Sequence, residues 1–297
     1  MYNPVKRRRG YSLSLLLVLS VLLLAACGSK PPTLTSTPVQ TDTPKPSETG
    51  APSATASPAP STPTLSPTAV VPSKTPGPVV CSPLEGFEIP DLADLITNPF
   101  APPRSGSDDP HQGVDLSDID PLYQIALEGR RVQAVMDGVV AGLIVDRFPY
   151  GNALIVETPL ELLPVELAGA IQLPTPAPTR QGHPSLTCPE SENPAVWDES
   201  VRSLYLIYAH LKEPPLFQAG DTILCGQELN AIGSSGNSLN PHLHLELRVG
   251  PTGARFDSMA HYTGSASSQE MYNYCLWRVS ETFQRMDPMQ VFLTNLK

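Results

Sequence analysis

Two histidine-containing motifs, far apart in the sequence, carry side chains that could bind a metal ion. The first is HQGVD at residues 111–115, in which His111 precedes Asp115 by four positions. Gly113 lies between them and lets the backbone bend so that both side chains can converge. Imidazole nitrogen with carboxylate oxygen is a ligand pair that suits zinc. In isolation, the same spacing is also typical of a surface histidine and a solvated aspartate.

The second motif, His242-Leu243-His244, begins a segment in which polar and apolar residues alternate. Because side chains alternate across a strand, His242 and His244 share one face with Glu246 and Arg248. One imidazole can then bind a metal while the other lies beside the metal's open position. The alternative is an edge strand whose half-exposed polar face happens to hold histidines. Glu246 is interpreted either as a partner that orients a histidine or as a solvated or salt-bridged residue.

The elements that would position these motifs are mostly strands. Helical periodicity is weak and predicts only short helices near residues 91–96 and 280–286. A fourth histidine, His210, lies near the end of a strand pattern. The fold is therefore predicted to be mainly antiparallel β, in one domain of residues 81–297. Alternating or β-branched runs predict the strands Arg131–Met136, Val139–Val145, Ala153–Glu157, Leu204–Leu211, Thr222–Leu224 and His242–Val249.

The first 27 residues have the organisation of a secretion signal. Four basic residues at positions 6–9 precede an almost uninterrupted apolar run at 11–26. The run ends in Leu24-Ala25-Ala26-Cys27, which resembles the bacterial lipobox. Residues 1–27 are therefore predicted to be a lipoprotein signal peptide with Cys27 lipidated, and the rest of the chain to be exported. The alternative is an uncleaved membrane anchor, for which the run is short because a spanning helix needs about 20 apolar residues.

Residues 28–80 are predicted to be a disordered tether. From Pro31 to Val80, 31 of 50 residues are Pro, Ser or Thr and none is aromatic, so the segment cannot bury enough apolar area to offset its ordering entropy. Beyond the signal, 15 Lys and Arg face 29 Asp and Glu, a net charge near −14. This balance argues against nucleic acid or an acidic membrane surface as a partner. The sequence does not indicate an oligomeric state.

Prolines break the strand pattern between residues 158 and 200, which predicts a long inserted loop, and residues 251–274 are also predicted to be irregular. His183 and His261, in these two stretches, are interpreted as surface residues. The domain holds four cysteines without Cys-x-x-Cys spacing, which in an exported chain favours disulfides over a cysteine zinc site. Of the three possible pairings, we predict Cys188 with Cys225 and Cys81 with Cys275.

Together, these residues resemble the lysostaphin/LytM-type family of zinc peptidoglycan endopeptidases. The resemblance implies a β-sheet domain of the duplicated hybrid motif type, with a groove and a core at residues 98–249. It implies that His111, Asp115 and His244 bind Zn²⁺, and that His210 and His242 form the catalytic pair. The matching blocks are Asn98-Pro99-Phe100, HQGVD at 111–115, VQAVMDGVV at 132–140, YGNALIVE at 150–157, YAHL at 208–211, GQELNAIGSSGNS at 226–238, PHLHLELR at 241–248 and Asp287-Pro288.

The resemblance also implies a function and a place of action. The chain would hydrolyse peptide bonds in the stem or cross-bridge peptides of peptidoglycan, lipid-anchored to a membrane of the cell envelope and outside the cytoplasm. Two alternatives stay open: a non-catalytic wall-binding or amidase-activating module, and a metal-storage or sensing lipoprotein. Because known non-catalytic relatives lack some of the five site residues, the complete set favours an enzyme.

The chain departs from the family pattern at three places. Ala101-Pro102-Pro103-Arg104 follows the first block, residues 158–200 replace a short connection, and Leu239-Asn240 precedes Pro241 where glycine is common. These differences lie around the expected groove rather than at the metal. They concern the identity of the substrate more than the chemistry.

Overall fold

The computed structural model describes residues 80–101, 108–171, 186–191 and 194–294. The chain divides into two units, Met1–Thr68 and Ala69–Lys297, and all described residues belong to the second. The predicted signal peptide, Cys27 and nearly all of the predicted tether therefore lie outside the described residues. Among the described residues, no helix is long and apolar enough to cross a membrane.

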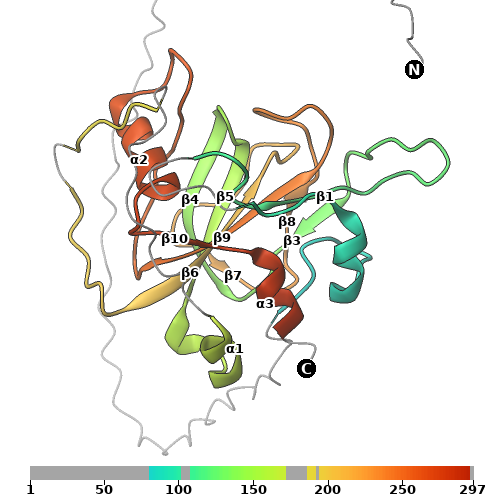
Figure 1. The fold of residues 1–297 in the computed structure, drawn as a ribbon, viewed down its shortest axis with the longest axis horizontal. Coiled ribbons are helices and arrows are strands. Elements are labelled where there is room, and N and C mark those ends of the chain that lie inside the picture. Colours follow the sequence, from blue (N-terminus) through green and yellow to red (C-terminus); the bar gives the residue numbers. More distant parts are fainter. Residues whose placement is uncertain (1–79, 102–107, 172–185, 192–193, 295–297) are drawn as a thin grey trace, which may run out of the picture. The chain divides into compact units, whose positions relative to one another are not determined.

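The domain is built on an antiparallel sheet that runs through its centre (Figure 1). Within the described residues, the path through this sheet is β1 (Ile96–Asn98), β2 (Val114–Leu116), β9 (Leu243–Pro251), β6 (Arg202–Ala209), β5 (Gly151–Pro159), β4 (Gly138–Arg147) and β7 (Thr222–Ile223). β10 (Gln284–Met286) also pairs with β9. β3 (Arg131–Gln133) and β8 (Glu228–Ala231) form a separate two-stranded sheet. The prediction of a mainly antiparallel β fold is confirmed.

The helical segments are short and lie outside the sheet. They are η1 (Ile89–Leu95), η2 (Leu160–Leu162), α1 (Val165–Ala170), α2 (Ser268–Arg278) and α3 (Pro288–Thr294). The predicted helix near residues 91–96 overlaps η1. The other two predictions are wrong: residues 280–286 contain β10, and the irregular stretch 251–274 runs into α2. The described part of the predicted insertion, residues 158–200, contains η2 and α1.

Helix α2 begins with a capping box formed by Ser267 and Glu270. The Ser267 hydroxyl accepts from the backbone N–H of Glu270, whose carboxylate accepts from the backbone N–H of Ser267. This arrangement satisfies two backbone donors that a helix start otherwise leaves unpaired. The helix is positioned so that its last turn, with Trp277 and Arg278, packs against the sheet.

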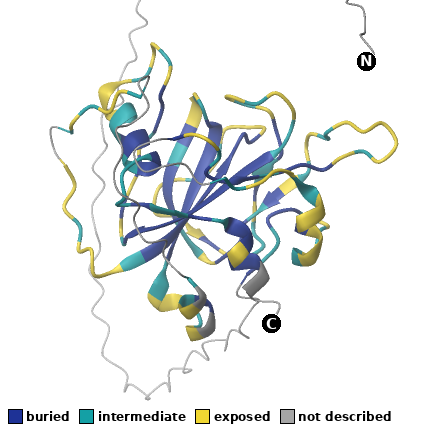
Figure 2. Cartoon of the chain, viewed as in Figure 1, coloured by how far each residue is buried: buried dark blue, intermediate teal, exposed yellow. Residues whose placement is uncertain are grey.

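Apolar side chains cover both faces of the central sheet, so β9 is buried along its whole length (Figure 2). On one face, Leu243, Leu245 and Leu247 pack with residues of η1, α1 and α3. On the other face, Ile207 of β6 packs in a second cluster that includes Trp277. The alternative of a half-exposed edge strand for residues 242–249 is therefore wrong.

Two disulfides join Cys81 to Cys225 and Cys188 to Cys275. The presence of disulfides is confirmed, but the predicted pairing is wrong. Cys81 donates its backbone N–H to the carbonyl of Val135 at 2.8 Å, and the sulfur of Cys225 lies 3.2 Å from the same carbonyl. Cys188 instead joins the insertion to α2, a helix that the strand-based interpretation did not contain.

Candidate metal and catalytic site

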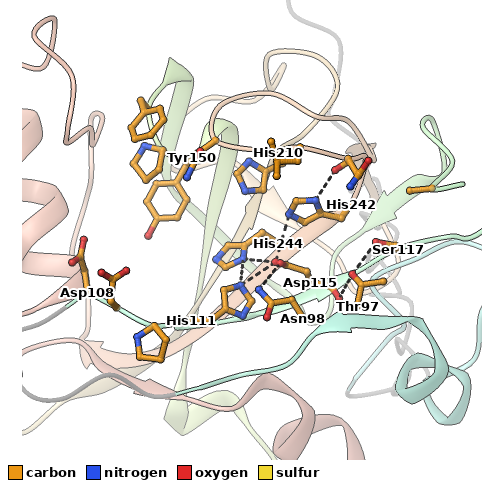
Figure 3. A pocket seen from close by; sticks show the side chains of 18 of the residues that line it. Thr97, Asn98, Asp108, His111, Asp115, Ser117, Tyr150, His210, His242 and His244 are labelled. Atoms are coloured by element: carbon orange, nitrogen blue, oxygen red, sulfur yellow. Dashed lines mark hydrogen bonds and ion pairs between the residues drawn. The ribbon is translucent and has the colours of Figure 1, made fainter. Parts of the chain in front are cut away.

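The five predicted site residues meet in one groove of about 710 Å³ (Figure 3). Strand register explains how distant parts of the chain converge there. Asp115 of β2 lies opposite His244 of β9, and Ala209 of β6 lies opposite His244 on the other side. His210 directly follows β6 and His242 directly precedes β9, so both lie at the same end of the sheet.

His111, Asp115 and His244 form a cluster with metal-ligand geometry. Asp115 Oδ1 lies 3.1 Å from His111 Nε2 and 2.7 Å from His244 Nδ1, and these two nitrogens are 3.1 Å apart. Two imidazole nitrogens and one carboxylate oxygen are a donor set that zinc prefers, and three protein ligands leave a coordination position open. The residues present therefore fit a zinc ion.

The second nitrogen of each ligand histidine is already committed to an oxygen of the chain. His111 Nδ1 lies 3.0 Å from the carbonyl oxygen of Pro99, and His244 Nε2 lies 3.1 Å from the Glu246 carboxylate. Because these oxygens can only accept, each of those nitrogens carries the proton. When the rings are neutral, His111 Nε2 and His244 Nδ1 have lone pairs directed at the cluster, which is the arrangement that metal ligation requires.

The cluster concentrates negative charge around His244. Burial alone would raise the pKa of Asp115, but hydrogen bonds with His111 and His244 hold the pKa far below its usual range. Burial alone would lower the pKa of His244, yet the carboxylates of Asp115 and Glu246 raise it to about 9. Without an ion, a proton on His244 offsets the two carboxylates, and a bound cation would replace that proton.

Glu246 is a fully buried partner of His244 rather than a solvated residue. Its carboxylate accepts from the hydroxyl of Tyr150 at 3.0 Å and from the indole N–H of Trp277 at 2.8 Å. Arg248 donates to it at 2.8 Å, and Arg278 donates to its other oxygen. Burial would raise the pKa of Glu246, but the two guanidinium charges outweigh it and keep the pKa well below its usual range.

His210 and His242 lie beside this cluster. Their ring centroids are 4.8 Å apart, and the ring of His210 lies 5.7 Å from that of His244. Each points Nδ1 at a backbone oxygen 2.7 Å away, of Ser235 for His210 and of Asn240 for His242. His242 Nε2 lies 3.5 Å from the same carboxylate oxygen that joins the two ligand histidines. Burial lowers the pKa of His210 to about 3, so this imidazole is neutral.

His210 also has an unusual backbone conformation. Its φ is 58°, in the left-handed region that few residues other than glycine adopt. A hydrogen bond of 3.0 Å from its N–H to the carbonyl of Tyr150 holds it there. Such strain is concentrated at functional sites, where it fixes a side chain in a required direction.

The structure corrects one histidine and adds residues that the sequence analysis gave no role. His261 is buried, and its Nε2 lies 2.7 Å from the carbonyl oxygen of Thr187, so its interpretation as a surface residue is wrong. His183 lies outside the described residues. Asn98, within a block that matches the family, donates to Asp115 Oδ2 at 3.0 Å. Tyr150, also within such a block, and Trp277 had no sequence signal for their contact with Glu246.

No protein-family model and no curated protein matches this chain. Solved structures of M23, LytM and lysostaphin peptidases are among its structural neighbours. A putative peptidase M23 from Pseudomonas aeruginosa is 15% identical with a TM-score of 0.31, and the match covers 67% of this chain and 48% of that one. This chain thus spans about half the length of the Pseudomonas protein.

Two further neighbours are matched over nearly their whole length. A variant of the catalytic domain of the prophage-encoded M23 protein EnpA from Enterococcus faecalis is 20% identical, with a TM-score of 0.32 and coverage of 61% of this chain and 95% of that one. The catalytic domain of lysostaphin from Staphylococcus simulans is 16% identical, with a TM-score of 0.34 and coverage of 69% and 98%. At these identities and TM-scores the function has to be inferred from the site itself.

Proposed function

We propose that this chain is a zinc-dependent endopeptidase of the lysostaphin/LytM type that cleaves peptide bonds in the stem or cross-bridge peptides of peptidoglycan. The motif resemblance supports the family and the substrate. One observation supports the chemistry above the others. Each of four histidines has one ring nitrogen hydrogen-bonded to an oxygen of the chain. The other nitrogens of His111, His244 and His242 lie 3.1, 2.7 and 3.5 Å from Asp115 Oδ1, and the ring of His210 lies 4.8 Å from that of His242.

His111, Asp115 and His244 would hold the zinc ion. When bound, zinc supplies Lewis acidity, which activates a water molecule and polarises a carbonyl group. Pro99 and Glu246 keep His111 and His244 in the tautomers that ligation needs. Asn98 holds the second oxygen of the Asp115 carboxylate and so fixes the direction of the first.

His210 and His242 would handle protons and charge beside the ligand cluster. His210 is neutral, and its Nδ1–H donates a hydrogen bond to the Ser235 carbonyl. Its Nε2 therefore has a lone pair and can accept a proton from the attacking water. His242 points Nε2 toward Asp115, beside the ligand cluster, where an N–H at that nitrogen would donate a hydrogen bond to the oxyanion that develops on the attacked carbonyl. Preorganised donors of this kind lower the barrier because they need no rearrangement during the reaction.

Digestion of purified peptidoglycan tests the proposal, with new primary amines as the readout. The zinc-loaded full chain should release amines. The His210→Ala variant should keep one zinc per chain by elemental analysis and the wild-type unfolding midpoint, yet release none. The Asp115→Ala variant should lose both zinc and cleavage. Cleavage by His210→Ala at the wild-type rate would contradict the catalytic role of that residue.

The same experiment separates the alternatives. A wild-type chain that binds zinc and peptidoglycan but releases no amines would be a wall-binding or amidase-activating module. Zinc binding without any affinity for peptidoglycan would indicate storage or sensing of the metal. In either case the proposed hydrolase is wrong.

We also propose that the enzyme is exported and anchored through a lipid on Cys27, with residues 28–80 as the tether that reaches the wall. The signal-like sequence of residues 1–27 supports this location. Mass spectrometry of the N-terminal peptide should find an acylated Cys27. A Cys27→Ser variant should move from the membrane fraction to the soluble fraction, and its retention at the membrane would contradict lipid anchoring.

A further inference from the structure

The groove extends away from the metal-ligand cluster to an end whose residues the proposed chemistry does not use. In Figure 3, Asp108 lies on the opposite side of His111 from Thr97 and Ser117. The lining of this end also includes Tyr262 and Tyr274. We define these three residues, Asp108, Tyr262 and Tyr274, as the acidic end of the groove.

Asp108 is a buried carboxylate with half of its hydrogen-bonding capacity unused. The residue is 4% exposed. Oδ2 accepts from the hydroxyls of Tyr262 at 2.6 Å and Tyr274 at 2.8 Å. Oδ1 is buried and has no hydrogen-bond partner among the described residues. A buried acceptor without a partner is destabilising, and more so when the group is charged, so a donor to Oδ1 would be strongly favoured.

The neighbouring groups do not supply that partner. Burial raises the pKa of Tyr262 and of Tyr274, so both phenols stay protonated and act as neutral donors to Oδ2. Arg278 is a cation close to Asp108, but it donates to the Glu246 carboxylate and to the backbone carbonyl of Asp108. Among the described residues, the Asp108 carboxylate forms no ion pair with a lysine or arginine.

We propose that the acidic end of the groove is a subsite for a protonated primary amine of the substrate, with Asp108 as its acceptor. The inference rests on the proposed function, because it assumes that a peptide lies in the groove. An ammonium group donates up to three hydrogen bonds, and its positive charge would balance the negative charge of the Asp108 carboxylate. The two tyrosine rings, with centroids 6.1 Å apart, would add attraction between the cation and their faces.

Tyr262 is the residue that would admit the amine. Its side chain is 44% exposed, whereas Tyr274 is buried. Its backbone φ of 60° is in the left-handed region, and its ring packs on His261 with centroids 4.3 Å apart. A small displacement of this exposed ring would open Oδ1 to the groove while Tyr274 keeps its hydrogen bond to Oδ2.

The position of Asp108 in the chain limits where the amine belongs on the substrate. Asp108 precedes His111 by three residues, so their Cα atoms are at most about 11 Å apart. An extended peptide advances about 3.3 Å per residue. The amine therefore belongs to a residue within about three positions of the cleaved bond. We assign it to the side chain of a diamino acid, because within a peptide chain the backbone nitrogens are amides and a free amine is carried by a side chain.

Equilibrium binding to the metal-free full chain tests the subsite without turnover. The probes are muropeptides before and after acetylation of their side-chain amines, which removes the charge. The wild-type protein should bind the acetylated form about tenfold more weakly or worse. Asp108→Asn, which keeps the shape of the side chain, should bind the free-amine form as weakly as the wild type binds the acetylated form, and its affinity for the acetylated form should be unchanged. Asp94→Asn, at an exposed position that does not line the groove, should keep the wild-type preference.

Three outcomes would overturn the subsite. One is equal affinity of the wild-type protein for both probes. This measurement uses the wild-type protein alone and so does not depend on whether a variant folds. Another is an Asp108→Asn variant that binds both probes more weakly than the wild type by the same factor and so keeps the preference, which would indicate a structural carboxylate. The third is loss of the preference in Asp94→Asn. A chain that prefers the free amine but never cleaves would contradict the hydrolase and support the subsite, whereas cleavage without a preference would do the reverse.

Discussion

The Nε2–H of His244 points at the carboxylate of Glu246, 3.1 Å away, and this bond decides which nitrogen of the histidine faces Asp115. Glu246 is itself held by Arg278 and Trp277 from α2. A helix remote in sequence thus orients a proposed metal ligand. Partners of this kind tune ligand basicity and fix the ring, and their loss weakens metal binding even though they never touch the ion.

Glu246→Gln should weaken zinc binding by about 10–100-fold, because the neutral amide no longer fixes the Nε2–H tautomer by charge. The free energy of unfolding should fall by about 3–5 kcal/mol, since Arg248 and Arg278 stay buried without their counter-charge. Competition with a chromophoric chelator measures the first effect and urea unfolding the second. Glu213→Gln, at an exposed position, is the control. A folded Glu246→Gln variant with wild-type zinc affinity would contradict the orienting role.

Gly113→Ala should lower both stability and zinc affinity, because there is no room for a methyl group. A Cβ at Gly113 would lie 2.5 Å from the backbone oxygen of Leu245 and 2.9 Å from Cε1 of His244. Overpacking of this kind costs about 1–3 kcal/mol and would displace the His244 ring. Gly169→Ala is the matched control, because no atom lies within 4 Å of its added Cβ. Equal unfolding midpoints and zinc affinities for the two variants would rule out this steric constraint.

Glu157 should make stability depend on pH at a place remote from the metal site. Burial would raise its pKa, but hydrogen bonds from Gly253, Arg255, Ser203 and Tyr205 outweigh burial and lower the pKa below 4.5. A lowered pKa in the folded state stabilises the fold above the unfolded value and loses that contribution as the pH falls through the folded value. The stability difference between wild type and Glu157→Gln should therefore be full at neutral pH and shrink below about pH 4.5. A difference that is constant with pH would contradict it.

The two disulfides should be found by non-reducing peptide mapping as Cys81 with Cys225 and Cys188 with Cys275. Replacing either pair with alanine should lower the free energy of unfolding by about 2–5 kcal/mol, because each bond closes a long loop in the unfolded chain. A mapped peptide that joins Cys188 to Cys225 would show that the pairing described here is wrong.

The convergence of the five site residues was predicted from the motif resemblance to a known family, and strand alternation added which residues of 242–249 share a face. The alternation in residues 242–249 correctly places His244 and Glu246 on one face. It could not reveal that α2 covers that face, because the polar residues suggested contact with solvent. The capping box at Ser267 and Glu270 was the sequence signal that indicated that helix. The amphipathic pattern of α2 is too weak to predict a helix by itself.

Other features depend on tertiary contacts that no local pattern records. The burial of His261 follows from the packing of residues around α2, and its sequence neighbours suggest only a loop. The cysteine pairing depends on which segments lie side by side, and α2 was missing from the prediction. The role of Asp108 is equally invisible in sequence, since its two tyrosine partners lie more than 150 positions away.

X-ray absorption spectroscopy at the zinc edge, on the zinc-loaded full chain, tests the central claim most directly. We predict one zinc per chain, with two imidazole nitrogens and carboxylate or water oxygens at about 2.0–2.2 Å. The same signal should disappear in Asp115→Ala and in His244→Ala. A chain that retains no zinc, a zinc ion bound by sulfur, or an unchanged spectrum in both variants would contradict the proposed site.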